Sequence, residues 1–184
     1  MASNVIADSG QILRDARSRY VERAQGGAHG AFDSEIGRSG KSPRSEVTVR
    51  RGATPAFAAD LLGSEDNAVI RERRMFADDR LVQLADTVIP AAVAAAAPQV
   101  AQEDTGVGGI ISRMADAGHA QVEVVEDVAL IPATAEQAEA LGVTAGDSLL
   151  SITHVGSTAD GKVVEVTRHV VGPGWTLRYG VPLG

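Results

Sequence analysis

The sequence of 184 residues has no cysteine, few aromatic residues and no long hydrophobic run. The absence of cysteine excludes a disulfide framework and thiolate metal sites, and it fits a reducing compartment. Only 3% of the residues are aromatic, so we expect a core of mainly Val, Leu, Ile and Ala. The most apolar run, residues 88–97, is too short to span a bilayer, and the N-terminus has no signal-peptide core. These features predict a soluble cytoplasmic protein with no membrane partner.

Patterns typical of catalysis and metal binding are also missing. The histidines at positions 29, 119, 154 and 169 do not have the i, i+4 spacing of a helical metal pair. Residues 146–150 lack the second glycine of a nucleophile elbow. There is no nucleotide-binding fingerprint and no nucleophile–base–acid set. We therefore predict no catalytic residues, no metal, no cofactor and no enzymatic activity.

The net charge of −7 is unevenly distributed along the chain. Residues 1–51 are net basic, whereas the remainder is strongly acidic. An acidic body repels nucleic acid, because affinity for DNA depends on clustered Lys and Arg. The basic N-terminal part either lies near DNA or is the solvated face of a linker helix.

A strand–helix–hairpin unit dominates residues 124–171. Thr134 and Gln137 have the spacing of a capping box, and Gly142 is placed to end the helix that follows them. Two Val- and Leu-rich strands then flank a tight turn at residues 159–161.

The same unit occurs about 80 residues earlier, in residues 47–89. Thr54 caps a helix with Pro55 at its first position, Gly63 ends the helix, and residues 78–80 form the hairpin turn. Two copies at this distance indicate a duplicated supersecondary unit.

The N-terminal part shows a weaker pattern. Residues 11–25 carry an imperfect apolar stripe at helical spacing, which predicts a helix. Residues 32–43 are expected to form a loop.

Polar side chains interrupt the apolar strands at matching places in the two copies. Arg71 and Arg73 are two residues apart, so they share one face of a strand, and a pair of arginines suits a carboxylate or phosphate. Gln83 and Glu165 on the returning strands supply acceptors. If the hairpins face one another, these groups converge in one pocket. In the alternative, the arginines form cross-strand ion pairs on a solvated face, with Glu65, Glu72 or Asp86.

A predicted helix over residues 110–117 follows Gly108 and Gly109 and has no acidic residue in its first turn. Its free N–H groups are suited to an anion. The glycines are equally explained by a tight turn into the helix.

An ordered set of segments resembles the effector-binding UTRA domain of GntR-type transcriptional regulators, specifically the HutC subfamily. The segments are R-x-R at 71–73, LADTVIP at 84–90, GVGGIISRMADAGH at 106–119, ATAEQAEALGVTAGDSLL at 133–150 and DGKVVEV at 160–166. The resemblance covers roughly residues 28–184. It implies an α+β fold related to chorismate lyase, with an antiparallel sheet and flanking helices. It also implies a homodimer and a pocket for a small-molecule effector, which is often anionic.

The resemblance also implies roles for individual residues. Arg71 and Arg73 match the family's basic pair, Glu165 matches its second-hairpin glutamate, and Gln83 lies near a polar ligand contact. The segment from Gly108 to Ser112 matches a loop that binds phosphate in phosphosugar-binding members.

Three positions depart from those members. Gly109 and Ile111 stand where the phosphosugar-binding members carry serine and tyrosine. His154 stands where the second hairpin of the family usually carries arginine. These departures favour a less polar effector, such as a carboxylate. The implied ligand-binding set is Arg71, Arg73, Gln83, Gly109, Ser112, His154 and Glu165.

The resemblance divides the chain into residues 1–25, a wing remnant and linker helix, and residues 26–184, the effector-binding domain. The winged helix-turn-helix is expected outside this sequence, either because the domain was excised or because the protein naturally lacks it. Operator DNA would then be contacted only through that N-terminal domain.

The sequence thus predicts a sensing and dimerisation domain of a bacterial repressor. Two alternatives remain: a dimerisation module whose pocket has decayed, and a lyase-like enzyme on the same fold.

Overall fold

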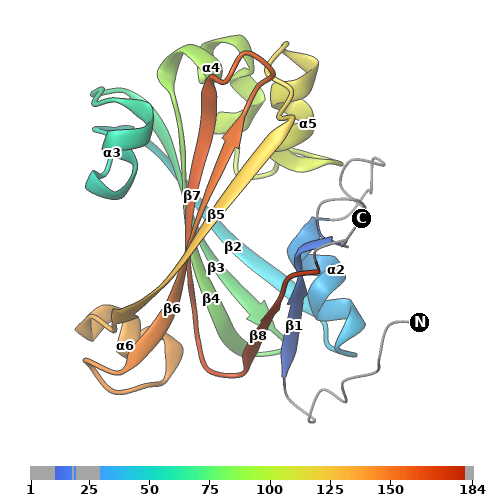
Figure 1. Ribbon diagram of the computed structural model, residues 1–184, viewed down its shortest axis with the longest axis vertical. Coiled ribbons are helices and arrows are strands. Elements are labelled where there is room, and N and C mark those ends of the chain that lie inside the picture. The colour runs from blue at the N-terminus through green and yellow to red at the C-terminus, as the bar shows by residue number, and fades with distance from the viewer. Residues whose placement is uncertain (1–10, 18, 20–29, 181–184) are drawn as a thin grey trace.

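The computed structural model describes residues 11–17, 19 and 30–180, and its centre is a six-stranded antiparallel sheet (Figure 1). In spatial order the strands are β2 (Pro43–Gly52), β3 (Ala68–Ala77), β4 (Arg80–Ile89), β7 (Val163–Val171), β6 (Ser148–Ser157) and β5 (Glu123–Pro132). A second, parallel pair joins β1 (Ile12–Asp15) to β8 (Trp175–Arg178).

The strand order confirms the predicted duplication. Each half runs strand, helix, hairpin: β2, α3 (Ala56–Leu62), β3 and β4 in the first half, and β5, α6 (Ala135–Leu141), β6 and β7 in the second. The halves meet where β4 pairs with β7, and Thr87 lies directly opposite Thr167 there. The α+β fold with an antiparallel sheet is therefore confirmed.

The sequence determines the ends of α6 locally. Thr134 Oγ1 accepts the Gln137 N–H at 3.1 Å while the Gln137 side chain accepts the Thr134 N–H, and Gly142 takes the left-handed conformation with φ 67°. The predicted capping box is therefore confirmed. In the first copy, Pro55 itself is the N-cap residue of α3, so the predicted position of the proline is wrong by one. Thr54 is instead hydrogen-bonded to Glu65.

Helices cover both faces of the sheet (Figure 1). On one face, α3 and α6 pack over the apolar residues of the central strands. The other face is covered by α2 (Ala31–Arg38), α5 (Gly109–Asp116) and the β1–β8 pair. A short helix, α4 (Ala91–Ala96), and a 3₁₀ turn (Pro98–Ala101) lead from β4 towards α5.

Two predictions for the N-terminal part are wrong. Ile12–Asp15 is a strand where a helix was expected, because buried Ile12 packs with Phe32 and Met75 and the backbone pairs with β8. Helical backbone occurs after it, at residues 16, 17 and 19, and most of the remaining predicted helix lies outside the described residues, as does the wing remnant. The expected loop at residues 32–43 is largely α2 and the start of β2.

Across the described ranges, no helix combines the length and apolar character needed to cross a membrane.

Candidate functional site

A cavity of about 380 Å³ lies on the sheet face that carries α2 and α5. Its walls come from the central strands, from α2 and from the glycine-rich start of α5. Its polar lining comprises Arg19, Asp33, Ser34, Ser45, Arg73, Gln83, Ser112, His154, Glu165, Thr167 and His169.

Six of the seven sequence-predicted residues line this cavity: Arg73, Gln83, Gly109, Ser112, His154 and Glu165. The strand register explains the convergence. Arg73 lies opposite Ala85, and Ala85 lies opposite His169. Residues at alternate positions of a strand point to the same face, and this places Arg73, Thr167 and His169 on the cavity side of the sheet.

Arg71 is the exception, since it does not line the cavity. Its buried guanidinium donates to the backbone oxygens of Val100 at 2.7 Å, of Glu103 at 3.0 Å, and of Gln102. Burial, followed by the charge of Arg73, lowers the pKa of Arg71 to about 10. Arg71 therefore fixes the segment before α5. The three acidic residues named in the alternative have other partners: Glu72 pairs with Arg50, Asp86 pairs with Arg168, and Glu65 accepts the N–H of Ala91.

Arg73 begins a hydrogen-bond chain across the centre of the sheet. Its Nη2 donates to Thr87 Oγ1 at 2.6 Å, and the Thr87 and Thr167 hydroxyls are 2.7 Å apart. Thr167 donates to Glu165 at 2.6 Å, so the donors run in one direction from the guanidinium to the carboxylate. The cavity floor thus has a basic end and an acidic end that are connected.

The acidic end is held by a residue from outside the sheet. Gln121 Nε2 donates to Glu165 Oε2 at 2.7 Å. Gly156 lies opposite Glu165 in the β6–β7 pair, and a Cβ at Gly156 would lie 2.5 Å from the Gln121 side chain. The glycine therefore makes room for this contact.

Two buried side chains keep hydrogen-bonding capacity. Gln83 donates to the Met75 sulfur at 2.8 Å, whereas its Oε1 has no partner among the described residues. His169 Nδ1 likewise has none within the described part of the chain. Burial, reinforced by the charges of Arg14, Arg19 and Arg73, holds the pKa of His169 well below its ordinary value. His169 is therefore a neutral imidazole that offers one donor and one acceptor.

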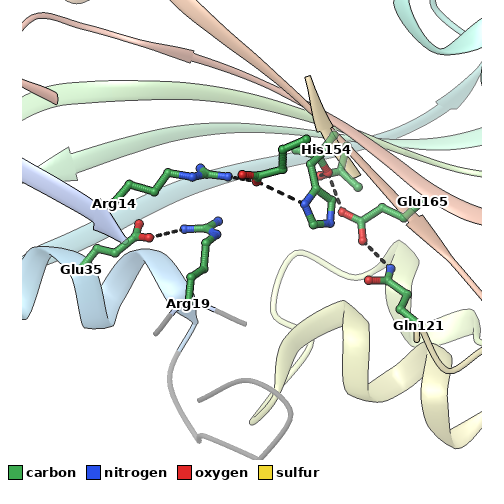
Figure 2. Close-up of polar contacts among 9 residues, drawn as sticks. Arg14, Arg19, Glu35, Gln121, His154 and Glu165 are labelled. Carbon is green, nitrogen blue, oxygen red and sulfur yellow. Dashed lines mark hydrogen bonds and ion pairs between the residues drawn. The ribbon is translucent and has the colours of Figure 1, made fainter. Parts of the chain in front are cut away.

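The segment that begins with β1 brings further charges to the cavity (Figure 2). Arg14 forms a buried ion pair with Glu126 of β5, and Glu126 Oε1 is 3.5 Å from His154 Nδ1. Arg19 lines the cavity and contacts Glu35 of α2 at 2.6 Å. Sequence reasoning missed these four charged residues, because it placed both arginines on a linker helix and Glu35 in a loop.

The start of α5 requires its glycines. Gly108 is left-handed with φ 83°, and a Cβ there would collide with Ser112 Oγ. Gly109 also has a positive φ of 65°. The tight turn and the helix start therefore occur together, and residues Gly108 to Ser112 line the same cavity as Arg19 and Arg73.

No group of three His, Cys, Asp or Glu side chains that could hold a metal ion occurs within residues 11–17, 19 and 30–180.

Comparisons with known proteins agree with this architecture. The sequence model of the UTRA domain family matches residues 38–172. A GntR-family transcriptional regulator of known structure superposes with a TM-score of 0.72 at 21% identity, over 83% of this chain and 64% of that chain. PhnF from Mycobacterium smegmatis gives 0.72 at 17% identity over 95% of this chain and 73% of its own. The effector domain of that PhnF gives 0.67 at 17% identity, over 83% and 94%. No curated protein sequence matches the chain.

Proposed function

The chain belongs to the UTRA domain family, and from this we propose that it is the effector-sensing and dimerisation domain of a cytoplasmic, bacterial GntR-type repressor of the HutC subfamily. In this proposal residues 26–184 are the sensing domain, and residues 1–25 connect it to a DNA-binding domain that contacts the operator. The observation that carries the sensing role is the cavity, which presents Gln83 and His169 with unused hydrogen-bonding atoms. Buried polar groups are normally paired, so these two are suited to a ligand.

The charges of the cavity support an anionic effector. Arg73 and Arg19 both line it, together with the start of α5, and these are the groups that bind carboxylates and phosphates. Glu165 and His169 stand along β7 and suit hydroxyl or amide groups on the rest of the molecule. Arg71 takes no part in this version of the site, since backbone oxygens occupy its guanidinium.

The same cavity provides a route to the N-terminal segment. Arg19 and Arg14 belong to that segment; Arg19 reaches the cavity itself, and Arg14 reaches it through Glu126 and His154. An effector that binds Arg19 competes with Glu35, and one that binds His154 changes the surroundings of Glu126. Effector binding would therefore favour one arrangement of the segment over another, which is the condition for coupling to operator binding.

The two alternatives are less well supported by the site. A decayed pocket should have closed or lost its polar groups, whereas this cavity is open and lined by polar side chains. The known structures that resemble the chain are transcriptional regulators, so the lyase-like enzyme stays the weaker interpretation.

A thermal-shift panel tests the proposal. Carboxylates, phosphosugars, phosphonates and fatty acids would each be compared with an uncharged analogue of the same skeleton. A ligand at about 100 times its dissociation constant adds roughly 2.7 kcal/mol of stability. We expect a saturable shift from one anionic class and a much smaller shift from its neutral analogue. Equal shifts from both would contradict the anionic effector, and no shift from any compound would favour the decayed pocket.

A further inference from the structure

Gln83 and His169 each have a buried atom without a hydrogen-bond partner among the described residues, and the strand register places the two side chains close together. Gln83 lies opposite Val171 in the β4–β7 pair, and His169 precedes Val171 by two positions, on the same face of the sheet. Gln83 and His169 are therefore diagonal neighbours, within reach of one group bound between them. Both line the cavity, and they are only 2% and 5% exposed.

The unused atom of Gln83 is an acceptor. Its Nε2 donates to Met75 Sδ at 2.8 Å, and a thioether sulfur accepts hydrogen bonds but cannot donate them. This contact orients the amide so that Oε1 is the atom left without a partner in the described part of the chain. An amide oxygen attracts a hydrogen-bond donor without carrying a negative charge, so Gln83 calls for a donor but not for a cation.

The surroundings of His169 oppose a positively charged group. Burial, and after it the charges of Arg14, Arg19 and Arg73, hold the pKa of His169 well below its ordinary value. The same burial and the same three guanidinium groups would act on a ligand ammonium placed beside the imidazole. A donor bound between Gln83 and His169 is therefore favoured when it is neutral.

The carboxylate of Glu165 does not compensate for this positive charge. Glu165 and His169 are four residues apart along β7, which is roughly 13 Å in a strand. Glu165 also accepts hydrogen bonds already, from Thr167 at 2.6 Å and from Gln121 at 2.7 Å. An ammonium group beside His169 would therefore gain little from the acidic end of the cavity.

We propose that Gln83 and His169 form a specificity subsite that binds one neutral hydrogen-bond donor of the effector, a hydroxyl or an amide N–H. Arg73 and the start of α5 hold the anionic group of the same molecule. The effector class is then acids that carry a hydroxyl or amide group, and acids that carry an amine are rejected. This inference rests on the proposed sensing function and adds the second chemical group that the cavity selects.

Thermal unfolding without any ligand gives the first test. A buried polar group that lacks a partner destabilises the free protein, and an apolar side chain of similar shape removes that cost. Gln83→Met should therefore raise the unfolding midpoint by a few degrees, as expected where a site is kept for a ligand. Gln121→Met is the matched control and should lower the midpoint, because that amide is hydrogen-bonded to Glu165. A midpoint for Gln83→Met at or below that of the wild type would overturn the proposal.

Calorimetric titration with matched acids gives the second test. The probes are the ω-hydroxy, unsubstituted and ω-amino acids from butyrate to hexanoate, together with the corresponding alkylphosphonates. At one chain length the hydroxy member should bind at least about tenfold more tightly than the other two, because only it pairs the buried acceptor. Gln83→Met should abolish this preference and still bind the unsubstituted acid.

The outcomes separate the subsite from the sensor. Tighter binding of the amino member, equal binding of the hydroxy and unsubstituted members, or a hydroxyl preference that survives in Gln83→Met would overturn the subsite and leave an anionic sensor in place. Failure of every probe to bind would instead count against a carboxylate or phosphonate effector. The unfolding midpoint of Gln83→Met would then decide the subsite by itself.

Discussion

At the scale of single residues, Arg71 and Arg73 show how two neighbouring positions with the same side chain take different roles. Both lie on the same face of β3, yet Arg71 is bound by backbone oxygens of residues 100, 102 and 103 while Arg73 lines the cavity. Their difference comes from the segment after α4, which covers one of them. Sequence spacing indicated the shared face, but the covering segment is a tertiary contact between residues about 30 positions apart.

His169 gives a prediction for the pH dependence of stability. Its pKa is depressed in the folded protein, first by burial and then by the charges of Arg14, Arg19 and Arg73. Below an ordinary pKa of about 6.5 the unfolded chain binds a proton that the folded chain does not, so stability is lost as the pH falls. This one residue lowers the free energy of unfolding by up to about 1.4 kcal/mol for each pH unit below that value.

Urea denaturation from pH 8 to pH 5 checks this prediction. The free energy of unfolding should fall less steeply below pH 6.5 in His169→Gln than in the wild type. Each protein is compared with its own stability at pH 8. Parallel curves for the two proteins would show that His169 is not held neutral.

At the scale of secondary-structure elements, β1 is a strand of only four residues that depends on contacts outside its own backbone. Its Arg14 and the Glu126 partner on β5 are 2% and 5% exposed. Removing one member of a buried pair leaves an uncompensated charge and costs about 3–5 kcal/mol. The pair therefore holds the N-terminal segment against the sheet.

A double-mutant cycle measures this anchor. Arg14→Met and Glu126→Gln should each lower the free energy of unfolding, and the double variant should lose clearly less than the sum. Arg50 and Glu72 are the matched control, because they are about half exposed and such a pair contributes at most about 1 kcal/mol. Additive effects at Arg14 and Glu126 would show that their contact does not hold β1.

The duplicated elements could be predicted from sequence, whereas the N-terminal elements could not. The capping box at Thr134, the stop at Gly142 and the alternating strands are local signals, and each formed as expected. β1 and β8 have only four residues each, and the conformation of β1 and α2 follows from contacts with distant residues, such as Phe32 with Met75. The Phe32–Ile36 spacing of four was the available signal for α2, but the neighbouring glycines obscured it.

At the scale of the whole molecule, Glu126 connects two features. It contacts Arg14 of the N-terminal segment and the cavity residue His154. A change at the cavity therefore has a short structural route to the N-terminal segment. Side chains two residues apart on a strand point to the same face of a sheet. This period is why the convergence of polar residues from the two hairpins could be predicted from the sequence.

The most direct test of the account is calorimetric titration of the ligand found in the anion panel into the wild type, Arg73→Ala and Arg50→Ala. Arg73 lines the cavity, whereas Arg50 is exposed on β2. Only the substitution of Arg73 should therefore weaken ligand binding. Loss of a charge-assisted hydrogen bond costs about 1.5–3 kcal/mol, which corresponds to roughly a ten- to hundredfold weaker affinity. The account predicts this loss for Arg73→Ala and wild-type affinity for Arg50→Ala. A folded Arg73→Ala that binds as tightly as the wild type would contradict it.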